Sequence, residues 1–209
     1  IKGYLETIAD NLDSFDSRWH KPIEQMRSQS QRMENIVRDL LVLSSIETRA
    51  APRAQEKIDL EELAQEIKGH TQEIMAEKQH NFSINCPNEI ILLGQRSELY
   101  SALSNLVINA AKYTPASGMI ELRAALDSTG VKIEVEDNGL GIESHHIPRL
   151  TERFYRVDPS RSAESGGTGL GLAIVKHILA RHDSELEVKS TPRKGSVFGC
   201  HIPRERVLD

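Results

Sequence analysis

The stretch Leu99–Pro115, LYSALSNLVINAAKYTP, decides the fold because a helical pitch sorts its residues onto two faces. Asn105, Asn109 and Lys112 lie at i, i+4 and i+7 on one stripe. Asn is a poor helix former, so its repetition favours contact with a ligand or partner; a solvated polar face is the alternative. The neighbouring stripe has the spacing of a helix packed on a core: Leu99, Ala102, Leu103, Leu106, Val107 and Ala110.

The 209 residues, 38% hydrophobic and 27% charged, have the composition of a globular chain that can bury a core. The 26 basic and 31 acidic side chains give a net charge of −5, without the long single-sign run typical of nucleic-acid partners. Uncharged runs such as 99–111 fall short of the ~20 apolar residues of a membrane span, so we expect this fragment not to insert. Cys86 and Cys200 lack a CxxC spacing, which predicts buried free thiols in a cytoplasmic fragment.

Residues 1–50 have the pattern of a helical hairpin, with a helix over 1–12, a turn over 13–22 and a long helix to about Thr48. One hairpin is too narrow to cover the apolar seam of the second helix, so two chains are expected to form a dimeric four-helix bundle. Residues 51–57 mix Pro, Ala and charge without a period, which predicts a linker. The seam residues recur in steps of four and three: Met26, Ser30, Met33, Val37, Leu40 and Ser44.

From residue 58 to 209 the pattern predicts an α/β sandwich. Besides the two-faced helix, helices are expected over 60–77, over 143–150 and from the 166–172 segment to about Ala180. The fold class is therefore α+β, a helical hairpin followed by an amphipathic sheet with one face covered by helices. Strands are predicted where apolar and polar residues alternate: 81–86, 89–93, 119–126, 131–136, 184–190 and 196–202.

Two glycine clusters adjoin predicted helices, DNGLGI at 137–142 and GGTGLGL at 166–172. Glycine amides with no side chain in the way can hold an anion at a helix N-terminus; ordinary turn glycines are the alternative. No GxxxxGK followed by Ser or Thr occurs, which excludes a P-loop protein. Neither cluster is a GxGxxG joining strand to helix in a repeated βαβ series, so a dinucleotide-binding fold is excluded as well.

Four motifs follow one another in an order that resembles the ATP-binding domain of sensor histidine kinases. They are Asn-x-x-x-Asn-x-x-Lys-Tyr (105–113), Asp-Asn-Gly-x-Gly-Ile (137–142), Phe-Tyr-Arg (154–156) and Gly-Thr-Gly-Leu-Gly-Leu (167–172). The wider family, of the Bergerat or GHKL fold, includes DNA gyrase, the Hsp90 chaperones and the MutL repair proteins. The resemblance covers about 57–203, and the hairpin before it resembles the dimerisation and phosphoacceptor domain of these kinases.

The resemblance implies that ATP and Mg²⁺ are bound, with Asn109 coordinating the metal and Asn105 beside it. A carboxamide oxygen suits this hard ion, which takes few protein ligands and completes its shell with phosphate and water. The resemblance also implies that Asp137 accepts a hydrogen bond from the adenine amino group. The other residues implied to lie near the base are Gly139, Gly141, Ile142 and Ser196.

The implied phosphate site has Arg156 as a charge clamp on the γ-phosphate, under a lid at 157–167. For this cation and for Lys112 the alternative is an ordinary exposed surface charge. The other residues implied to contact the phosphates or the ribose are Lys112, Tyr113, Tyr155, Gly167, Thr168, Gly169, Leu170, Gly171 and Leu172.

None of the eight histidines has the family's phosphoacceptor motif, a His followed by an acid and then Arg-Thr-Pro-Leu or similar. In His20-Lys21-Pro22, the nearest match, Lys21 replaces the acid, and the tripeptide lies in the predicted turn. Since the chain begins with Ile1, we expect a piece of a longer, inner-membrane-anchored protein whose acceptor histidine precedes this residue. The remaining histidines are predicted to be surface residues without a metal: His70, His80, His145, His146, His177, His182 and His201.

Two other functions compete with histidine phosphorylation. An ATP-hydrolysing conformational machine of the gyrase and chaperone kind would carry a Glu four residues before Asn109 as general base, where this chain has Asn105. A catalytically silent ATP-binding module would be expected to lose Asn109, Asp137 or the glycines, all of which are present. Phosphoryl transfer to a protein histidine is therefore favoured, with a second copy of the chain and a response regulator receiver domain as implied partners.

Overall fold

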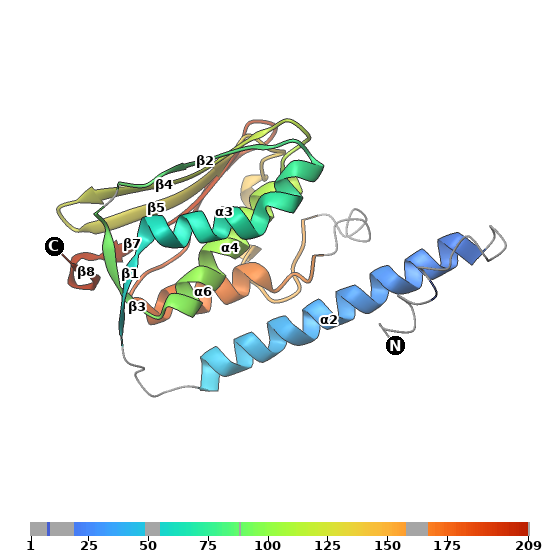
Figure 1. Cartoon of the computed structure of the whole chain (residues 1–209), viewed down its shortest axis with the longest axis horizontal. Coiled ribbons are helices and arrows are strands. Elements are labelled where there is room, and N and C mark those ends of the chain that lie inside the picture. Colours follow the sequence, from blue (N-terminus) through green and yellow to red (C-terminus); the bar gives the residue numbers. More distant parts are fainter. Residues whose placement is uncertain (1–7, 9–18, 49–54, 88, 158–166, 209) are drawn as a thin grey trace.

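The computed structural model describes residues 8, 19–48, 55–87, 89–157 and 167–208. The described chain consists of a two-layer α/β domain and one long helix, α2 (His20–Thr48), that lies along it (Figure 1). Most of the predicted first helix, turn, linker and lid lies outside the described residues. Within the described ranges, no helix is both long and apolar enough to cross a membrane.

The larger sheet has five strands in the order β2-β4-β5-β7-β6. β2 pairs with β4 in parallel, and the other neighbours are antiparallel. The strands agree with the predicted segments to within three residues, because alternating apolar residues mark the buried face. Their bounds are β2 (Asn81–Asn85), β4 (Met119–Asp127), β5 (Gly130–Asp137), β6 (Glu187–Thr191) and β7 (Gly195–Pro203).

A smaller antiparallel sheet lies near the C-terminal end of the chain (Figure 1) and has the order β1-β3-β8. β1 begins inside the segment predicted as linker, because residues 56–59 pair with 91–94. β8 and the 3₁₀ helix η4 before it were not predicted, since elements of two or three residues show no periodicity. The bounds are β1 (Glu56–Asp59), β3 (Ile91–Gly94), η4 (Arg204–Arg206) and β8 (Val207–Leu208).

Helices cover one face of the five-stranded sheet (Figure 1). α3 has its predicted bounds and begins where the Asp59 carboxylate accepts a hydrogen bond from Glu62 N at 3.0 Å. The segment predicted as a helix over 143–150 forms a 3₁₀ helix containing Pro148. The bounds are α3 (Leu60–Glu77), α4 (Arg96–Tyr113), η3 (Ser144–Arg149) and α6 (Gly171–Arg181).

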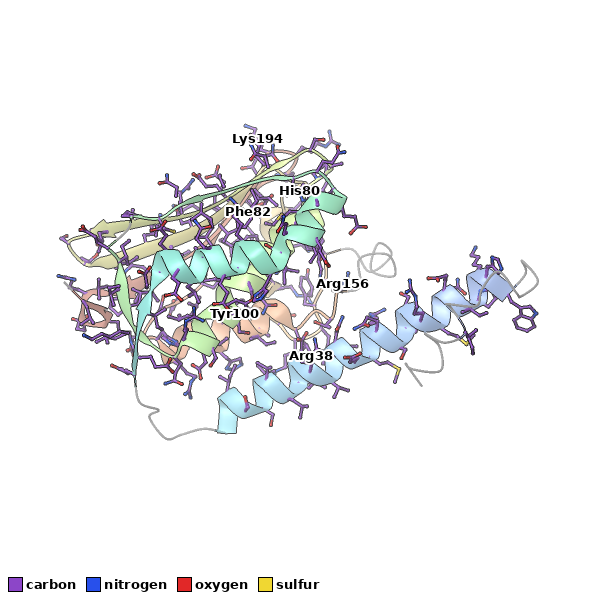
Figure 2. All side chains as sticks on the ribbon, in the orientation of Figure 1. Arg38, His80, Phe82, Tyr100, Arg156 and Lys194 are labelled. Atoms are coloured by element: carbon purple, nitrogen blue, oxygen red, sulfur yellow. The ribbon has the colours of Figure 1, made fainter. Side chains whose placement is uncertain are left out.

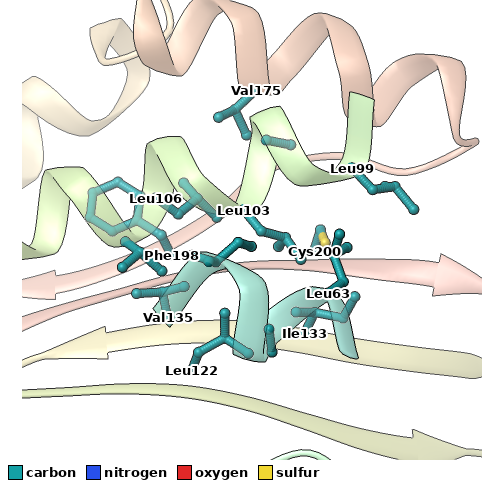
Figure 3. Close-up of a cluster of buried hydrophobic side chains, with 14 of the residues drawn as sticks. Leu63, Leu99, Leu103, Leu106, Leu122, Ile133, Val135, Val175, Phe198 and Cys200 are labelled. Atoms are coloured by element: carbon teal, nitrogen blue, oxygen red, sulfur yellow. The ribbon is translucent and has the colours of Figure 1, made fainter. Parts of the chain in front are cut away.

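The predicted apolar face of α4 is confirmed, since all six of its residues are at most 3% exposed. Leu103 and Leu106 lie beside Val135 and Phe198 of the sheet in the core (Figure 3). Burying a Leu or Phe side chain stabilises the fold by about 1.5–3 kcal/mol. The apolar face therefore fixes how α4 is rotated on the sheet, and with it the direction of the polar stripe.

α2 divides its apolar residues between two surfaces. Leu43 (1% exposed) and Ile46 (7%) are buried against the α/β domain, where α2 contacts α6. The placement of His20-Lys21-Pro22 in a turn was wrong, because α2 begins at His20 and Pro22 lies in its first turn. A proline there removes a backbone N–H that has no helical partner in any case. The predicted bundle seam faces outward, with exposed Met26, Met33, Val37 and Leu40.

The prediction that His182 is a surface residue was wrong, because the structure places it 2% exposed at the end of α6. Its Nδ1 lies 2.8 Å from Ile178 O, and its Nε2 accepts a hydrogen bond from Gln95 N at 3.2 Å. A carbonyl only accepts and an amide only donates, so this pair of contacts fits the neutral ring. Burial lowers the pKa of His182.

We expect the stability of the protein to fall as pH drops below about 6.5, the ordinary histidine pKa. In that range the His182 ring binds a proton in the unfolded chain but not in the folded protein, where it is buried. Among the nearby charges, Glu98 raises the pKa of His182, whereas Arg206 and Arg181 lower it. His182→Gln should flatten the decline between pH 7 and pH 5 in thermal melts, whereas His145→Gln, at an exposed histidine, should leave it unchanged. An identical decline in all three proteins would contradict this assignment.

Candidate nucleotide-binding site

The polar stripe of α4 is divided between a structural contact and an open carboxamide. Asn105 Nδ2 donates to Ser101 O at 2.8 Å, and its Oδ1 lies where a Cβ at Gly171 would be only 2.6 Å away. Asn105 therefore packs α4 against the first residue of α6. Asn109, one turn further along and half-buried, has no side-chain hydrogen bond to any described residue. Its oxygen is available to a ligand.

The first glycine cluster forms a tight turn against the C-terminal end of α4. A Cβ at Gly139 would lie 2.6 Å from Tyr113 O, so only glycine permits this approach. Leu140 N donates to the same carbonyl at 3.2 Å. The turn brings the end of β5, where Asp137 stands, next to the polar stripe of α4.

Asp137 is 6% exposed, and its carboxylate accepts a hydrogen bond from Gly139 N at 2.8 Å. Burial raises the pKa of this carboxyl, while the backbone amides of Gly139 and Ser196 oppose the rise. The two amides hold the carboxylate in one orientation at the end of β5. A fixed, buried acceptor of this kind suits recognition of a neutral N–H donor such as the amino group of a base.

Ser190 joins the second half of the turn to β7, a role that the sequence analysis missed. Its hydroxyl accepts from Ile142 N at 2.8 Å, donates to Gly195 O at 3.0 Å and lies 2.9 Å from Ser196 Oγ. Gly141 has φ +66°, and a Cβ there would lie 2.0 Å from Thr191 O. The two predicted residues Ile142 and Ser196 are thus held together through a serine of β6.

The second glycine cluster leads into the N-terminus of α6. Gly169 O accepts a hydrogen bond from Phe154 N at 2.9 Å, and Leu170 N donates to Thr168 Oγ1 at 3.2 Å. α6 follows from Gly171, so its free amides and the positive end of its dipole lie beside Asn105. This is the arrangement expected for holding phosphate groups.

Two cations lie close to this loop. The Arg156 guanidinium lies against Gly167 and donates to its carbonyl oxygen. Figure 2 shows Arg156 on the side of the domain that faces α2, near the part of that helix that carries Arg38. Burial lowers the pKa of Lys112, the Arg156 cation lowers it further, and the Asp39 carboxylate opposes both effects. Two cations held together in this way favour a multiply charged anion.

The two predicted tyrosines lie differently. Tyr113 is 48% exposed at the end of α4, so its ring is accessible to a ligand. The Tyr155 hydroxyl lies 2.6 Å from His146 Nδ1, and Arg149 stacks over the Tyr155 ring at 4.2 Å. Tyr155 is therefore engaged with η3.

The residues brought together fit ATP with Mg²⁺. The glycines allow the two loops to pack closely against their neighbours around α4, two cations lie beside the second loop, and Asn109 offers one free oxygen. No group of three His, Cys, Asp or Glu side chains among the described residues is placed to hold a metal ion. A cation here would take its ligands from Asn109 and from the phosphates themselves.

Lys78, at the C-cap of α3, is a second residue that the sequence analysis missed. Its Nζ donates to Lys112 O at 2.8 Å, Ala111 O at 2.9 Å and Thr114 O at 3.4 Å. His80 Nε2 lies 3.2 Å from Thr114 O as well. These contacts satisfy carbonyls that the end of α4 leaves unpaired, at the point where α4 meets the Gly139 turn.

A groove lies beside the C-terminal half of α3. It runs between α3 and β2 and includes His80 and Phe82 (Figure 2), together with Gln65, Lys68 and Gln72. It contains none of the predicted site residues.

Comparison with known proteins identifies the family. The sequence profile of the histidine kinase-, DNA gyrase B-, and HSP90-like ATPases matches residues 94–206. The chain therefore belongs to this family of ATPases. The predicted resemblance to sensor histidine kinases is confirmed.

Within the family, the chain is 44% identical over 209 residues to the phosphate regulon sensor protein PhoR of Pseudomonas aeruginosa and 42% identical over 208 residues to that of Haemophilus influenzae. Each alignment covers 100% of this chain but only 47% and 48% of the relative, so the chain spans about half the length of these curated relatives. The segments ERFYRVD (152–158), GLAIVKH (171–177) and RHDSEL (181–186), the last in place of the more usual His-Gly-Gly, indicate the same resemblance.

Solved structures agree on the fold. Full-length ShkA in complex with AMPPNP has a TM-score of 0.74 at 21% identity, covering 97% of this chain and 46% of that one. The mycobacterial sensor histidine kinase MprB has a TM-score of 0.61 at 26% identity, covering 72% of this chain and 97% of that one. The described chain therefore has the helix and ATP-binding sandwich of a sensor histidine kinase.

Replacing Lys78 should reveal how its contacts with the end of α4 affect the site. Lys78→Met leaves three carbonyls without their cationic donor and should lower the free energy of unfolding by about 1–3 kcal/mol. It should also weaken ATP binding, because the Gly139 turn rests on the end of α4. Urea unfolding and ATP titration test both effects against Lys68→Met, at an exposed lysine of the same helix. Equal stability and equal ATP affinity of the two variants would show that the Lys78 contacts support neither the fold nor the site.

Proposed function

We propose that the chain binds Mg²⁺-ATP between the polar stripe of α4 and the two glycine loops, and delivers the γ-phosphoryl group to a histidine. The acceptor lies on the bundle helix upstream of Ile1 in the longer protein, and a response regulator aspartate receives the group next. Membership of an ATPase family and the 44% identity to a sensor kinase support this proposal.

The identity of Asn105 is the reason for proposing phosphoryl transfer rather than ATP hydrolysis. A carboxamide cannot take a proton from water, so the position that a hydrolytic relative uses for its general base has none here. The structure also turns this side chain away from that task, since it bonds to Ser101 O and packs on Gly171. The nucleophile must therefore come from outside the ATP site.

Imidazole meets this need because it is nucleophilic at neutral pH without a strong base. Its nitrogen bonds to the γ-phosphorus as the bond from phosphorus to the bridging oxygen breaks, and ADP leaves with the electron pair. Lys112, Arg156 and the amides at the start of α6 compensate the charge on the phosphoryl oxygens. Mg²⁺, held by Asn109, would neutralise and orient the phosphates. Asp137 and the Gly139 turn hold the base.

The exposed apolar seam of α2 indicates a partner. Its outward seam exposes Met26, Met33, Val37 and Leu40 in helical register, with Met33 66% exposed. We propose that a second copy of the chain covers this seam in the dimeric bundle. A receiver domain would dock on the same hairpin, and the fragment would lie on the cytoplasmic side of a membrane-anchored protein.

The full-length protein, incubated with γ-labelled ATP and Mg²⁺, should acquire an acid-labile, base-stable label. Asn109→Ala should reduce labelling by on the order of 100-fold, as loss of one preorganised electrostatic group does. It should melt close to wild type, because Asn109 is not on the buried face of α4.

Ser104→Ala, a half-buried neighbour on the same helix, is the matched control and should label normally. The fragment 1–209 should bind ATP without becoming labelled. Stable labelling of any of its eight histidines would overturn the upstream position of the acceptor. A large loss of melting temperature in Asn109→Ala, with ATP affinity kept, would make Asn109 structural.

A further inference from the structure

One acidic residue of α2 reaches the loop at 167–170 that leads into α6, the phosphate loop. Asp39 Oδ2 accepts a hydrogen bond from Thr168 Oγ1 at 2.6 Å, across 129 residues of sequence. The same hydroxyl oxygen accepts a hydrogen bond from Leu170 N. Through Thr168, Asp39 is therefore bonded to the turn that leads into α6. Asp39 is half-buried, unlike its exposed neighbours Arg38 and Leu40.

The groups around Asp39 are those that the proposed function assigns to phosphate. Thr168 donates a hydrogen bond to it directly. The Asp39 carboxylate raises the pKa of Lys112, and the Arg156 guanidinium lowers it. A carboxylate that accepts from the Thr168 hydroxyl and offsets the charge near Lys112 presents the oxygen and the negative charge that a phosphate group would present there. Without it the two cations would face each other with less compensation.

The docking of α2 fixes Asp39 in this position. Asp39, Leu43 and Ile46 lie at i, i+4 and i+7, on one face of the helix. Leu43 and Ile46 are buried against the domain, and Arg181 Nη1 donates to Ile46 O at 3.4 Å. The apolar contact with α6 therefore determines the register of α2, and this register places the carboxylate at the glycine loop.

We propose that Asp39 occupies the place of the terminal phosphate in the nucleotide-free protein and competes with ATP for it. This inference rests on the proposed nucleotide site. Binding of the γ-phosphate displaces the carboxylate from Thr168 and breaks the polar contact between α2 and the phosphate loop. Asp39 thereby lowers affinity for nucleotides in proportion to the charge they place there, and it couples ATP binding to release of the domain from α2.

Affinity measurements on the fragment 1–209 test this proposal. Asp39→Asn keeps an oxygen that can accept from Thr168 but removes the charge, and Asp39→Ala removes both. Both should bind Mg²⁺-ATP about 5- to 50-fold more tightly than wild type, the usual range of coupling between contacts. AMP, which lacks the terminal phosphates, should change by less than about twofold. Glu24→Gln, at an exposed carboxylate of α2 paired with Arg27, is the control and should match wild type.

The outcomes separate the two proposals. If wild type and both Asp39 variants fail to bind ATP, the proposed function fails and this inference with it. If wild type binds ATP and the Asp39 variants bind it equally or less tightly, the function stands and the competition is refuted. If ATP and AMP tighten alike, Asp39 acts on the whole fold rather than at the γ-phosphate position, which also overturns the proposal.

Discussion

The close approach of the Gly139 turn to the end of α4 is the constraint on which the site depends. Leu140 N bonds to Tyr113 O at 3.2 Å, and a side chain at Gly139 would collide with that carbonyl. This contact brings the end of β5, where Asp137 stands, to the C-terminal end of α4. Lys78 binds the carbonyls of the same helix end, so the end of α4 is held by two separate contacts.

α4 serves two purposes because its faces are separate. Its apolar face is fixed in the core, and its polar stripe therefore points in one direction, towards the glycine loops. α6 contributes its N-terminus to the same place, packed so closely that Gly171 leaves room for the Asn105 carboxamide. α2, docked on α6, adds the Asp39 carboxylate. The packing of three helices thus determines the electrostatics of the proposed anion site.

The sequence predicts the long periodic elements well, since α3 has its expected bounds and the apolar face of α4 is buried as expected. It could not predict contacts between distant segments. Ser190, Lys78 and Asp39 show no motif, and each acts through a partner at least five residues and up to 129 residues away. His182 was misjudged because its burial comes from the loop at Gln95. The predicted turn at Pro22 is wrong because the first turn of a helix accepts proline equally well.

A backbone amide NMR titration of the chain with Mg²⁺-ATP tests the central claim most directly. The account predicts the largest shifts at 109–113, at 139–142 and at 167–172, the three segments that the fold brings together. Little change is expected along the groove between α3 and β2 that His80 and Phe82 line. Shifts confined to that groove, with the glycine turns unaffected, would contradict the account.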